Sequence, residues 1–163
     1  MALAITPFRA LCGFRPLPEI AAHLEATPEL ASLLPPLILQ QFMDISPNSE
    51  ESTSLNAKQA LKEVFSAIMK ADENEIKTNL QSLVNRYQKE PLSAENISRD
   101  IVDVVLRLNT QFPGDVGVFC PFLLNYVTLN PGEAIFLGAG EPHAYVEGGK
   151  FPAFLPSPFL FVC

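Results

Sequence analysis

Residues 131–145 read PGEAIFLGAGEPHAY, and this stretch says most about the fold. The Pro-Gly pair at its start predicts a β-turn, and the apolar residues that follow predict a short strand over 134–137. A glycine-rich loop over 138–142 then leads to His143, which opens the next predicted strand. Tyr145 lies two residues further on, so both side chains face the same side of that strand. The stretch therefore predicts a β segment that presents a histidine and a tyrosine together.

His143 is the candidate for chemistry in this segment. Pro142 restricts the backbone just before His143 and so stiffens the loop that presents it. A neutral imidazole held on a stiff loop is a good ligand for zinc or iron. The alternative is an ordinary histidine at a loop edge, because a metal site needs three or four ligands. For Glu133, in the Pro-Gly-Glu turn, we expect solvation or capping of backbone N–H groups. For Glu141, in the loop just before Pro142, we likewise do not expect a catalytic role. For His23, which has no pattern of carboxylates or cysteines around it, we expect a surface position.

Upstream of this segment the sequence predicts helices. Two short helices are expected between 17 and 34, ended by the prolines at 35 and 36, and a polar loop is expected over 44–54. Three longer amphipathic helices follow before residue 112, the second opened by Asp72 and Glu75 in a pattern like a capping box. Their apolar faces are Leu61, Val64, Phe65, Ile68 and Met69; Ile76, Leu80, Leu83, Val84 and Tyr87; and Ile97, Ile101, Val104, Val105 and Leu108. Core packing is favoured for these faces over binding of a partner helix or a membrane surface, because the polar faces mix both charge signs.

The remaining stretches predict extended chain. Residues 116–129 are rich in Val, Phe, Leu and Tyr and predict a strand or buried extended segment. Residues 2–5 predict a short apolar entry, and residues 12–16 predict a turn. The order is therefore a helical block followed by a β block.

Composition narrows the function without naming it. The chain has 163 residues, of which 48% are hydrophobic and 18% charged, with a net charge of −7. An acidic chain without a basic block argues against nucleic acid or an anionic membrane as partner. Cys12, Cys120 and Cys163 are too few for a disulfide framework or a cysteine-rich zinc site. Their odd number, together with an N-terminus that does not read as a signal peptide, predicts a cytoplasmic protein.

Three blocks carry a resemblance to a known family. Residues 125–134 read NYVTLNPGEA and lead to PHAY at 142–145, residues 6–15 read TPFRALCGFR, and residues 112–117 read FPGDVG. In this order they resemble the zinc-dependent type I mannose-6-phosphate isomerase (phosphomannose isomerase) family. The spacing from Gly132 to His143 also resembles the second cupin motif, with Gly138 in place of the usual proline.

This resemblance implies an α+β protein, in which a helical domain is followed by strands of an incomplete cupin-type (jelly-roll) β-barrel. It divides the chain into four parts. Residues 1–16 are an extended entry from the barrel, residues 17–112 the helical domain, residues 113–149 barrel strands, and residues 150–163 an unrelated tail.

The resemblance also implies a function. The family interconverts mannose 6-phosphate and fructose 6-phosphate, feeding GDP-mannose synthesis, with one zinc ion per full-length enzyme. By position in the motif, His143 is a zinc ligand and Tyr145 lines the sugar pocket. The family's three other zinc ligands and its catalytic arginine have no match in this sequence, so its catalytic residue is unknown. The expected partner is a small-molecule sugar phosphate, with no nucleic acid, membrane or protein partner evident.

We therefore expect an aldose–ketose isomerase by family, in a truncated form that is weakly active or inactive. One alternative is a catalytically dead fragment that acts only as an interaction module, or a gene product with incorrectly assigned ends. A cupin that binds a ligand without catalysis is a further alternative, disfavoured by the missing zinc motifs.

Overall fold

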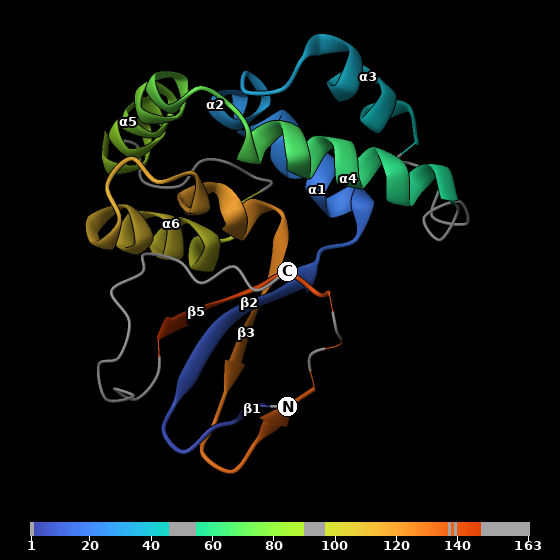
Figure 1. The fold of residues 1–163 in the computed structure, drawn as a ribbon. Helices are drawn as coiled ribbons and strands as arrows, with labels where there is room; N and C mark the ends of the chain where they lie inside the picture. Colours follow the sequence, from blue (N-terminus) through green and yellow to red (C-terminus); the bar gives the residue numbers. More distant parts are fainter. Residues whose placement is uncertain (1, 46–54, 90–96, 137, 139, 148–163) are drawn as a thin grey trace. The chain divides into compact units, whose positions relative to one another are not determined.

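The computed structural model describes residues 2–45, 55–89, 97–136, 138 and 140–147 (Figure 1). Within it the chain forms two compact units. One combines Met1–Phe14 with Leu124–Cys163 and is called the sheet unit below; the other, Arg15–Leu123, is called the helical unit. The expected tail at 150–163 and most of the expected polar loop, 46–54, lie outside the described residues.

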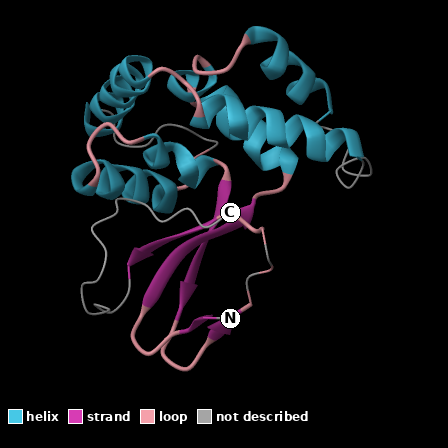
Figure 2. Ribbon diagram, in the orientation of Figure 1, coloured by secondary structure: helices cyan, strands magenta, loops and turns pink. Residues whose placement is uncertain are grey.

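Helices and strands separate cleanly between the two units (Figure 2). The helical unit contains α1 (Leu17–Ala26), α2 (Pro28–Ala31), α3 (Pro36–Ile45), α4 (Leu55–Met69), α5 (Glu73–Lys89), α6 (Arg99–Gln111) and the 3₁₀ helix η1 (Val116–Phe122). The sheet unit contains β1 (Ala2–Leu3), β2 (Phe8–Phe14), β3 (Leu124–Leu129), β4 (Ala134–Ile135) and β5 (His143–Glu147).

The sheet unit is built around β2. This strand pairs antiparallel with β3 on one side and with β5 on the other, in the order β3-β2-β5. In the part of the chain that the structure describes, β3 and β5 pair with no further strand, so the sheet is open. β1 and β4 form a separate antiparallel pair. The turn expected after Asn130 is confirmed, with Glu133 N–H donating to the Asn130 carbonyl at 3.0 Å and Gly132 at φ 92°.

The helical unit has its own apolar core. α4 packs mainly on α3, and α5 packs on α6, which in turn contacts η1. The expected apolar faces are largely confirmed, since most of their members are buried: Val64, Ile68, Ile76, Leu80, Leu83, Val84, Ile97, Ile101, Val104, Val105 and Leu108. The start of α5 is also as expected, because the Asp72 carboxylate accepts from the backbone N–H of Asn74 at 2.9 Å and of Glu75 at 3.3 Å.

The prolines at 35 and 36 open a helix, whereas the sequence pattern predicted only that they end one. They follow the end of α2, but α3 begins at Pro36, and Leu39 N–H donates to the Pro35 carbonyl at 3.1 Å. Proline suits the first turn of a helix because the N–H it lacks would have no partner there. The chain therefore continues as a helix that becomes the neighbour of α4.

The expected strand over 116–129 was correct only for its second half. Residues 124–129 form β3, but Val116–Phe122 form η1. Asp115 starts this helix by accepting from the backbone N–H of Gly117 at 2.7 Å, and Pro121 has no N–H for a strand ladder. Within the range 113–149, for which strands were expected, the first strand therefore begins only at Leu124. The expected turn at 12–16 was also wrong, because β2 runs to Phe14 through an irregularity between Cys12 and Phe14.

The helical unit is inserted between two paired strands. It leaves β2 at Arg15 and returns to β3 at Leu123, and the Arg15 N–H donates to the Leu123 carbonyl at 2.9 Å. The two ends of the insertion therefore lie side by side. No helix in the described ranges is long and apolar enough to cross a membrane.

Candidate functional site

The sheet register places His143 opposite the C-terminal half of β2. Cys12 of β2 is the Cα partner of His143 on β5 and of Asn125 on β3. Residues directly opposite each other in an antiparallel sheet share a face. Asn125, Cys12 and His143 therefore form a row across the three strands.

The imidazole of His143 is oriented by the backbone before it. Its Nδ1 lies 2.9 Å from the carbonyl oxygen of Glu141. A carbonyl can only accept, so Nδ1 carries the proton of the neutral ring, and the lone pair is left on Nε2. A backbone carbonyl on the second ring nitrogen is the usual arrangement for a histidine that binds a metal. His143 is half-buried, so its geometry fits a single metal ligand.

Tyr145 lies next to His143 on the same face, as expected from the two-residue period. The ring centroids of the two side chains are 5.9 Å apart at an interplanar angle of 63°. On its other side the Tyr145 ring meets Phe8 of β2 edge to face, at 5.2 Å. Tyr145 is nevertheless 56% exposed. The two packed rings thus hold a tyrosine whose surface is open to a ligand.

Both carboxylates close to His143 in sequence bind backbone N–H groups. Glu133 Oε2 accepts from the N–H of Asn130 at 2.6 Å, and Glu141 Oε2 accepts from the N–H of Gly138 at 3.1 Å. These bonds hold the turn and the loop on either side of β4. The expected capping by Glu133 agrees with its contact, and Glu141 makes a contact of the same kind.

The two described cysteines are buried thiols. Burial raises the pKa of Cys12, and the nearby Glu141 carboxylate raises it further. Burial raises the pKa of Cys120 strongly. Both therefore stay protonated near neutral pH, which makes them poor metal ligands and nucleophiles as they stand. Cys163 lies outside the described residues.

Within the described ranges, no three side chains among His, Cys, Asp and Glu gather as a metal site would require. Zinc sites in proteins use three or four protein ligands. The geometry at His143 thus fits one ligand of such a site, while the described residues do not make up the whole site.

The second histidine, His23, is not the surface residue that was expected. It is 6% exposed, and its Nδ1 lies 2.8 Å from the carbonyl of Phe122. Burial lowers its pKa, mainly through loss of hydration. The reason is long-range packing of η1 on α1, which joins residues 99 positions apart and leaves no local trace in the sequence. His23 is a core histidine.

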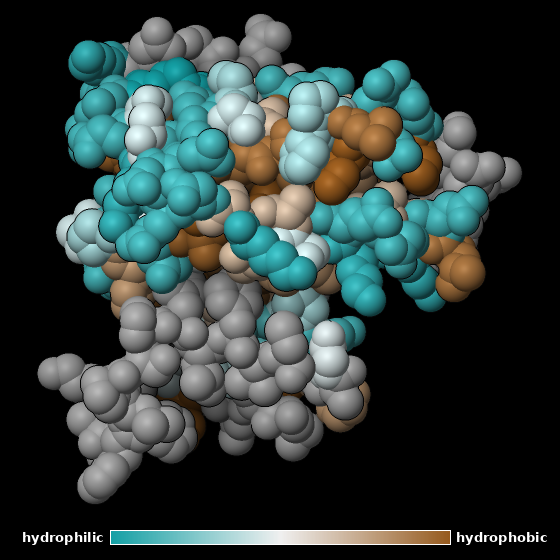
Figure 3. All heavy atoms as spheres, turned by 45° about the horizontal axis from the view of Figure 1, so that its top comes forward, coloured by the Kyte–Doolittle hydropathy of each residue, from teal (hydrophilic) through white to brown (hydrophobic). Residues whose placement is uncertain are grey.

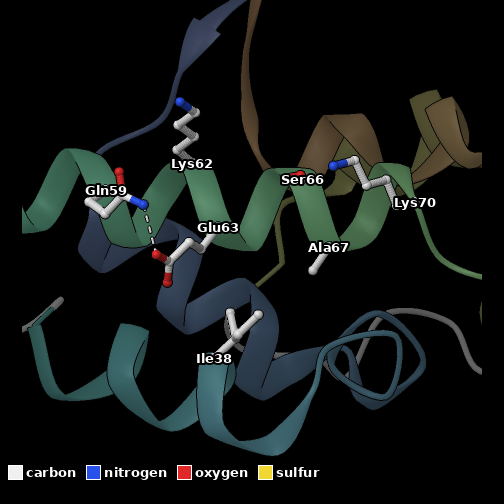
Figure 4. A pocket seen from close by; sticks show the side chains of 7 residues that line it. All are labelled: Ile38, Gln59, Lys62, Glu63, Ser66, Ala67 and Lys70. Atoms are coloured by element: carbon white, nitrogen blue, oxygen red, sulfur yellow. Dashed lines mark hydrogen bonds between the residues drawn. The ribbon is translucent and has the colours of Figure 1, made fainter.

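A shallow hollow of about 340 Å³ lies along α3 and α4, lined among others by Ile38, Glu63 and Ala67 (Figure 4). Glu63 accepts from Gln59 at 2.8 Å. Of the two lysines of the lining, Lys62 lies within α4 and points away from Ile38, and Lys70 directly follows the end of that helix. A sugar phosphate needs cationic groups that converge on it, and this hollow does not provide them. On the face seen in Figure 3, hydrophilic side chains cover much of the helical unit, and hydrophobic side chains gather in patches between them.

These observations define a class of protein: an open antiparallel sheet that carries a metal-compatible histidine, with a helical unit inserted between two of its strands. Comparison with known proteins narrows the class. Residues 37–124, just over half of the chain, match the family model of the phosphomannose isomerase type I helical insertion domain. The chain belongs to the type I phosphomannose isomerase family, which confirms the resemblance carried by the three sequence blocks.

Named relatives agree. The chain is 41% identical over 157 residues to a probable mannose-6-phosphate isomerase of Dictyostelium discoideum, covering 96% of this chain and 31% of the relative. It is 41% identical over 161 residues to the mannose-6-phosphate isomerase of Cryptococcus neoformans, and the match covers 91% of this chain and 37% of that relative. The chain thus spans about a third of the length of these curated relatives.

Solved structures agree as well. A crystal structure of mannose 6-phosphate isomerase from Salmonella typhimurium, bound to its substrate and to a zinc atom, matches with a TM-score of 0.63 at 29% identity. The match covers 90% of this chain and 32% of that one. The similarity therefore extends across both units of the chain.

The sequence blocks did not single out Asn125, Phe8 and Gly13 as neighbours of the site. Asn125 and Phe8 come from strands on either side of an insertion of more than a hundred residues. The one sequence feature that could have pointed to these residues is that they lie inside the blocks that resemble the family.

Proposed function

We propose that this chain is part of a mannose-6-phosphate isomerase, which interconverts mannose 6-phosphate and fructose 6-phosphate by aldose–ketose isomerisation and feeds GDP-mannose synthesis. The observation that carries the proposal is His143, with its lone pair on Nε2, beside an exposed Tyr145 in a chain of this family. The substrate is a small sugar phosphate, and the proposed compartment is the cytoplasm.

In this proposal β2, β3 and β5 are strands of a cupin-type jelly-roll barrel. The expected division placed the barrel at 1–16 and 113–149 and the helical domain at 17–112. In this proposal the helical domain extends through η1 to Leu123, because η1 packs on α6, and the second barrel segment begins at Leu124. The antiparallel pairing around β2 supports this division, because jelly-roll barrels are built from antiparallel strands.

His143 is proposed to hold zinc through Nε2 as one of several ligands, the others being supplied by segments of the family's enzymes that have no match in this sequence. When bound, such an ion polarises or orients the sugar oxygens. The roles of the chain's own residues are positional. The Glu141 carbonyl sets the direction of the imidazole, and the rings of Phe8 and His143 hold Tyr145 where its hydroxyl can donate to a sugar oxygen.

A coupled isomerase assay tests the proposal. Residues 2–147 replace the matching segment of the Cryptococcus neoformans enzyme, and the chain by itself is assayed with added zinc in parallel. We expect turnover from the chimera and none at a useful rate from the chain alone. Replacing Tyr145 by Phe should lower kcat/KM about tenfold, the effect of one lost hydrogen bond. Thr128→Ala, an exposed position on β3, serves as the matched control.

Two results would contradict the proposal. A folded, zinc-loaded chimera without turnover would favour the alternative of an interaction module. Turnover by the chain alone would show that the other ligands are not needed from elsewhere.

A further inference from the structure

β2 carries a bulge at the point where it faces His143. The pairing register shifts between Cys12 and Phe14, and Gly13 between them has φ 62°. Residues with a side chain rarely adopt this conformation, so glycine suits the position. The bulge lies in the same row of the sheet as His143 and Asn125.

The Asn125 side chain holds the bulge from the β3 side. Its Nδ2 lies 2.9 Å from the Phe14 carbonyl oxygen, 3.3 Å from that of Cys12 and 3.4 Å from that of Gly13. One amide group thus gathers three successive carbonyls of β2. A bulge leaves such groups without regular partners in the strand ladder, and a side-chain donor replaces those partners.

The bulge in turn holds the backbone that precedes His143. The Gly13 N–H donates to the Pro142 carbonyl at 2.9 Å. The next carbonyl upstream, that of Glu141, accepts from Nδ1 of His143. The carbonyls of Glu141 and Pro142 therefore both accept hydrogen bonds, the first from the imidazole of His143 and the second from the Gly13 N–H in the bulge. A rotation of either peptide plane would break one of these bonds.

We propose that Asn125 is a positioning residue for His143. It fixes the Gly13 bulge, the bulge fixes the Pro142 carbonyl, and the fixed loop backbone keeps the proton of His143 on Nδ1 and its lone pair on Nε2. The inference rests on the proposed role of His143 as a metal ligand and adds a residue that supports that role from another strand.

The test is heteronuclear NMR of the metal-free chain at about pH 8. It reads the tautomer of His143 and the hydrogen exchange rate of the Gly13 amide. In Asn125→Leu, which keeps the size and removes the donor, we expect Gly13 exchange to rise at least about tenfold, as for the loss of about 1.4 kcal/mol of protection. We also expect the proton of His143 to redistribute from Nδ1 towards Nε2.

Two further variants keep the test decisive. Asn125→Ser retains one donor, so its Gly13 exchange rate and His143 tautomer ratio should lie between those of the unmodified chain and of Asn125→Leu. This variant provides the test if the leucine variant weakens the sheet. Thr128→Val on the same strand should change neither measurement. An unchanged His143 tautomer in folded Asn125 variants would overturn the positioning role. This measurement is made without metal, so that result would not contradict the proposal that His143 binds zinc. Failure of the isomerase assay would in turn not contradict the effect of Asn125 on the His143 tautomer.

Discussion

His23 and His143 make the same hydrogen bond and differ in what surrounds them. Each places Nδ1 within 2.9 Å of a backbone carbonyl, that of Phe122 for His23 and that of Glu141 for His143. The ring of His23 is buried in the helical unit, so its second nitrogen has no access to a ligand from solvent. The ring of His143 is only half-buried, and its Nε2 is suited to bind one. Burial, rather than hydrogen bonding, separates the core histidine from the candidate ligand.

The lowered pKa of His23 predicts a pH dependence of stability. Its pKa in the folded chain lies below the unfolded value of about 6.5, so the unfolded chain binds the proton more tightly. The stabilisation from neutral His23 is complete above about pH 6.5 and is lost as the pH falls towards the folded pKa. In His23→Asn, whose side-chain amide can still donate to Phe122, urea unfolding followed by helical circular dichroism should show a flatter decline between about pH 7 and 5. An equal decline in both proteins would assign the effect to other groups.

The ion pair of Arg86 with Glu29 predicts a stability difference. The guanidinium donates to both carboxylate oxygens, at 2.8 and 2.7 Å, and both side chains are largely shielded. It joins α5 to α2. Bidentate pairs of this kind are stronger than ordinary surface pairs. We expect Glu29→Ala to lower the free energy of unfolding by about 1–3 kcal/mol, and Glu25→Ala, at an exposed site on α1, to change it by less than about 0.5 kcal/mol. Equal effects in urea titrations would show that the pair adds nothing.

At the scale of elements, local patterns predicted what depends on local rules. The spacing of Leu80, Leu83 and Val84 predicted α5, and Asp72 predicted its start, because helical periodicity and capping are set within a few residues. The same-face placement of His143 and Tyr145 followed from the period of a strand. These features needed no knowledge of the rest of the chain.

The elements that were missed depend on distant partners. Residues 117–122 of η1 are all buried, so apolar residues occupy every position of this segment. A continuous apolar run has no hydrophobic periodicity that could distinguish a helix from a strand. The bulge at Gly13 follows from the register against β3, across more than a hundred intervening residues. The hydrogen bonds of Asn125 share that cause. The long-range contacts of Asn125 and Gly13 could therefore not be predicted from the sequence, whereas His143 and its local contact with Glu141 lie within one short stretch.

The turn before β4 predicts a contrast between two glycines. Gly132 has φ 92° and open space where a Cβ would lie, so a substitution there meets only backbone strain. Gly138 has no such φ, and a Cβ would make ordinary contact with the Glu141 side chain at 3.5 Å. We expect Gly132→Ala to cost about 1–2 kcal/mol and Gly138→Ala to cost clearly less, measured by unfolding of the sheet unit. The reverse order would contradict the assigned turn.

At the scale of the whole molecule, the chain is a sheet interrupted by a helical insertion. The hydrogen bond from Arg15 N–H to the Leu123 carbonyl closes the insertion at its base. The insertion buries its own apolar residues, including Phe42, Phe119 and Phe122. A unit with its own core and adjacent ends can fold independently of the chain into which it is inserted.

This arrangement predicts the behaviour of the helical unit alone. Residues 15–123 expressed separately should retain a helical circular dichroism spectrum and unfold in one cooperative transition. The physical reason is that the core contacts of α1 to α6 and η1 lie within this range. A gradual loss of signal without a transition would show that the insertion depends on the sheet unit for its stability.

The central claim is that His143 is a zinc ligand of a type I phosphomannose isomerase. The zinc content of the dialysed chimera that carries residues 2–147, measured by elemental analysis, tests it most directly. We predict close to one zinc ion per chain, loss of most of it in His143→Ala, and no loss in Thr128→Ala, with all three proteins folded by circular dichroism. Full zinc occupancy in a folded His143→Ala chimera would contradict the claim.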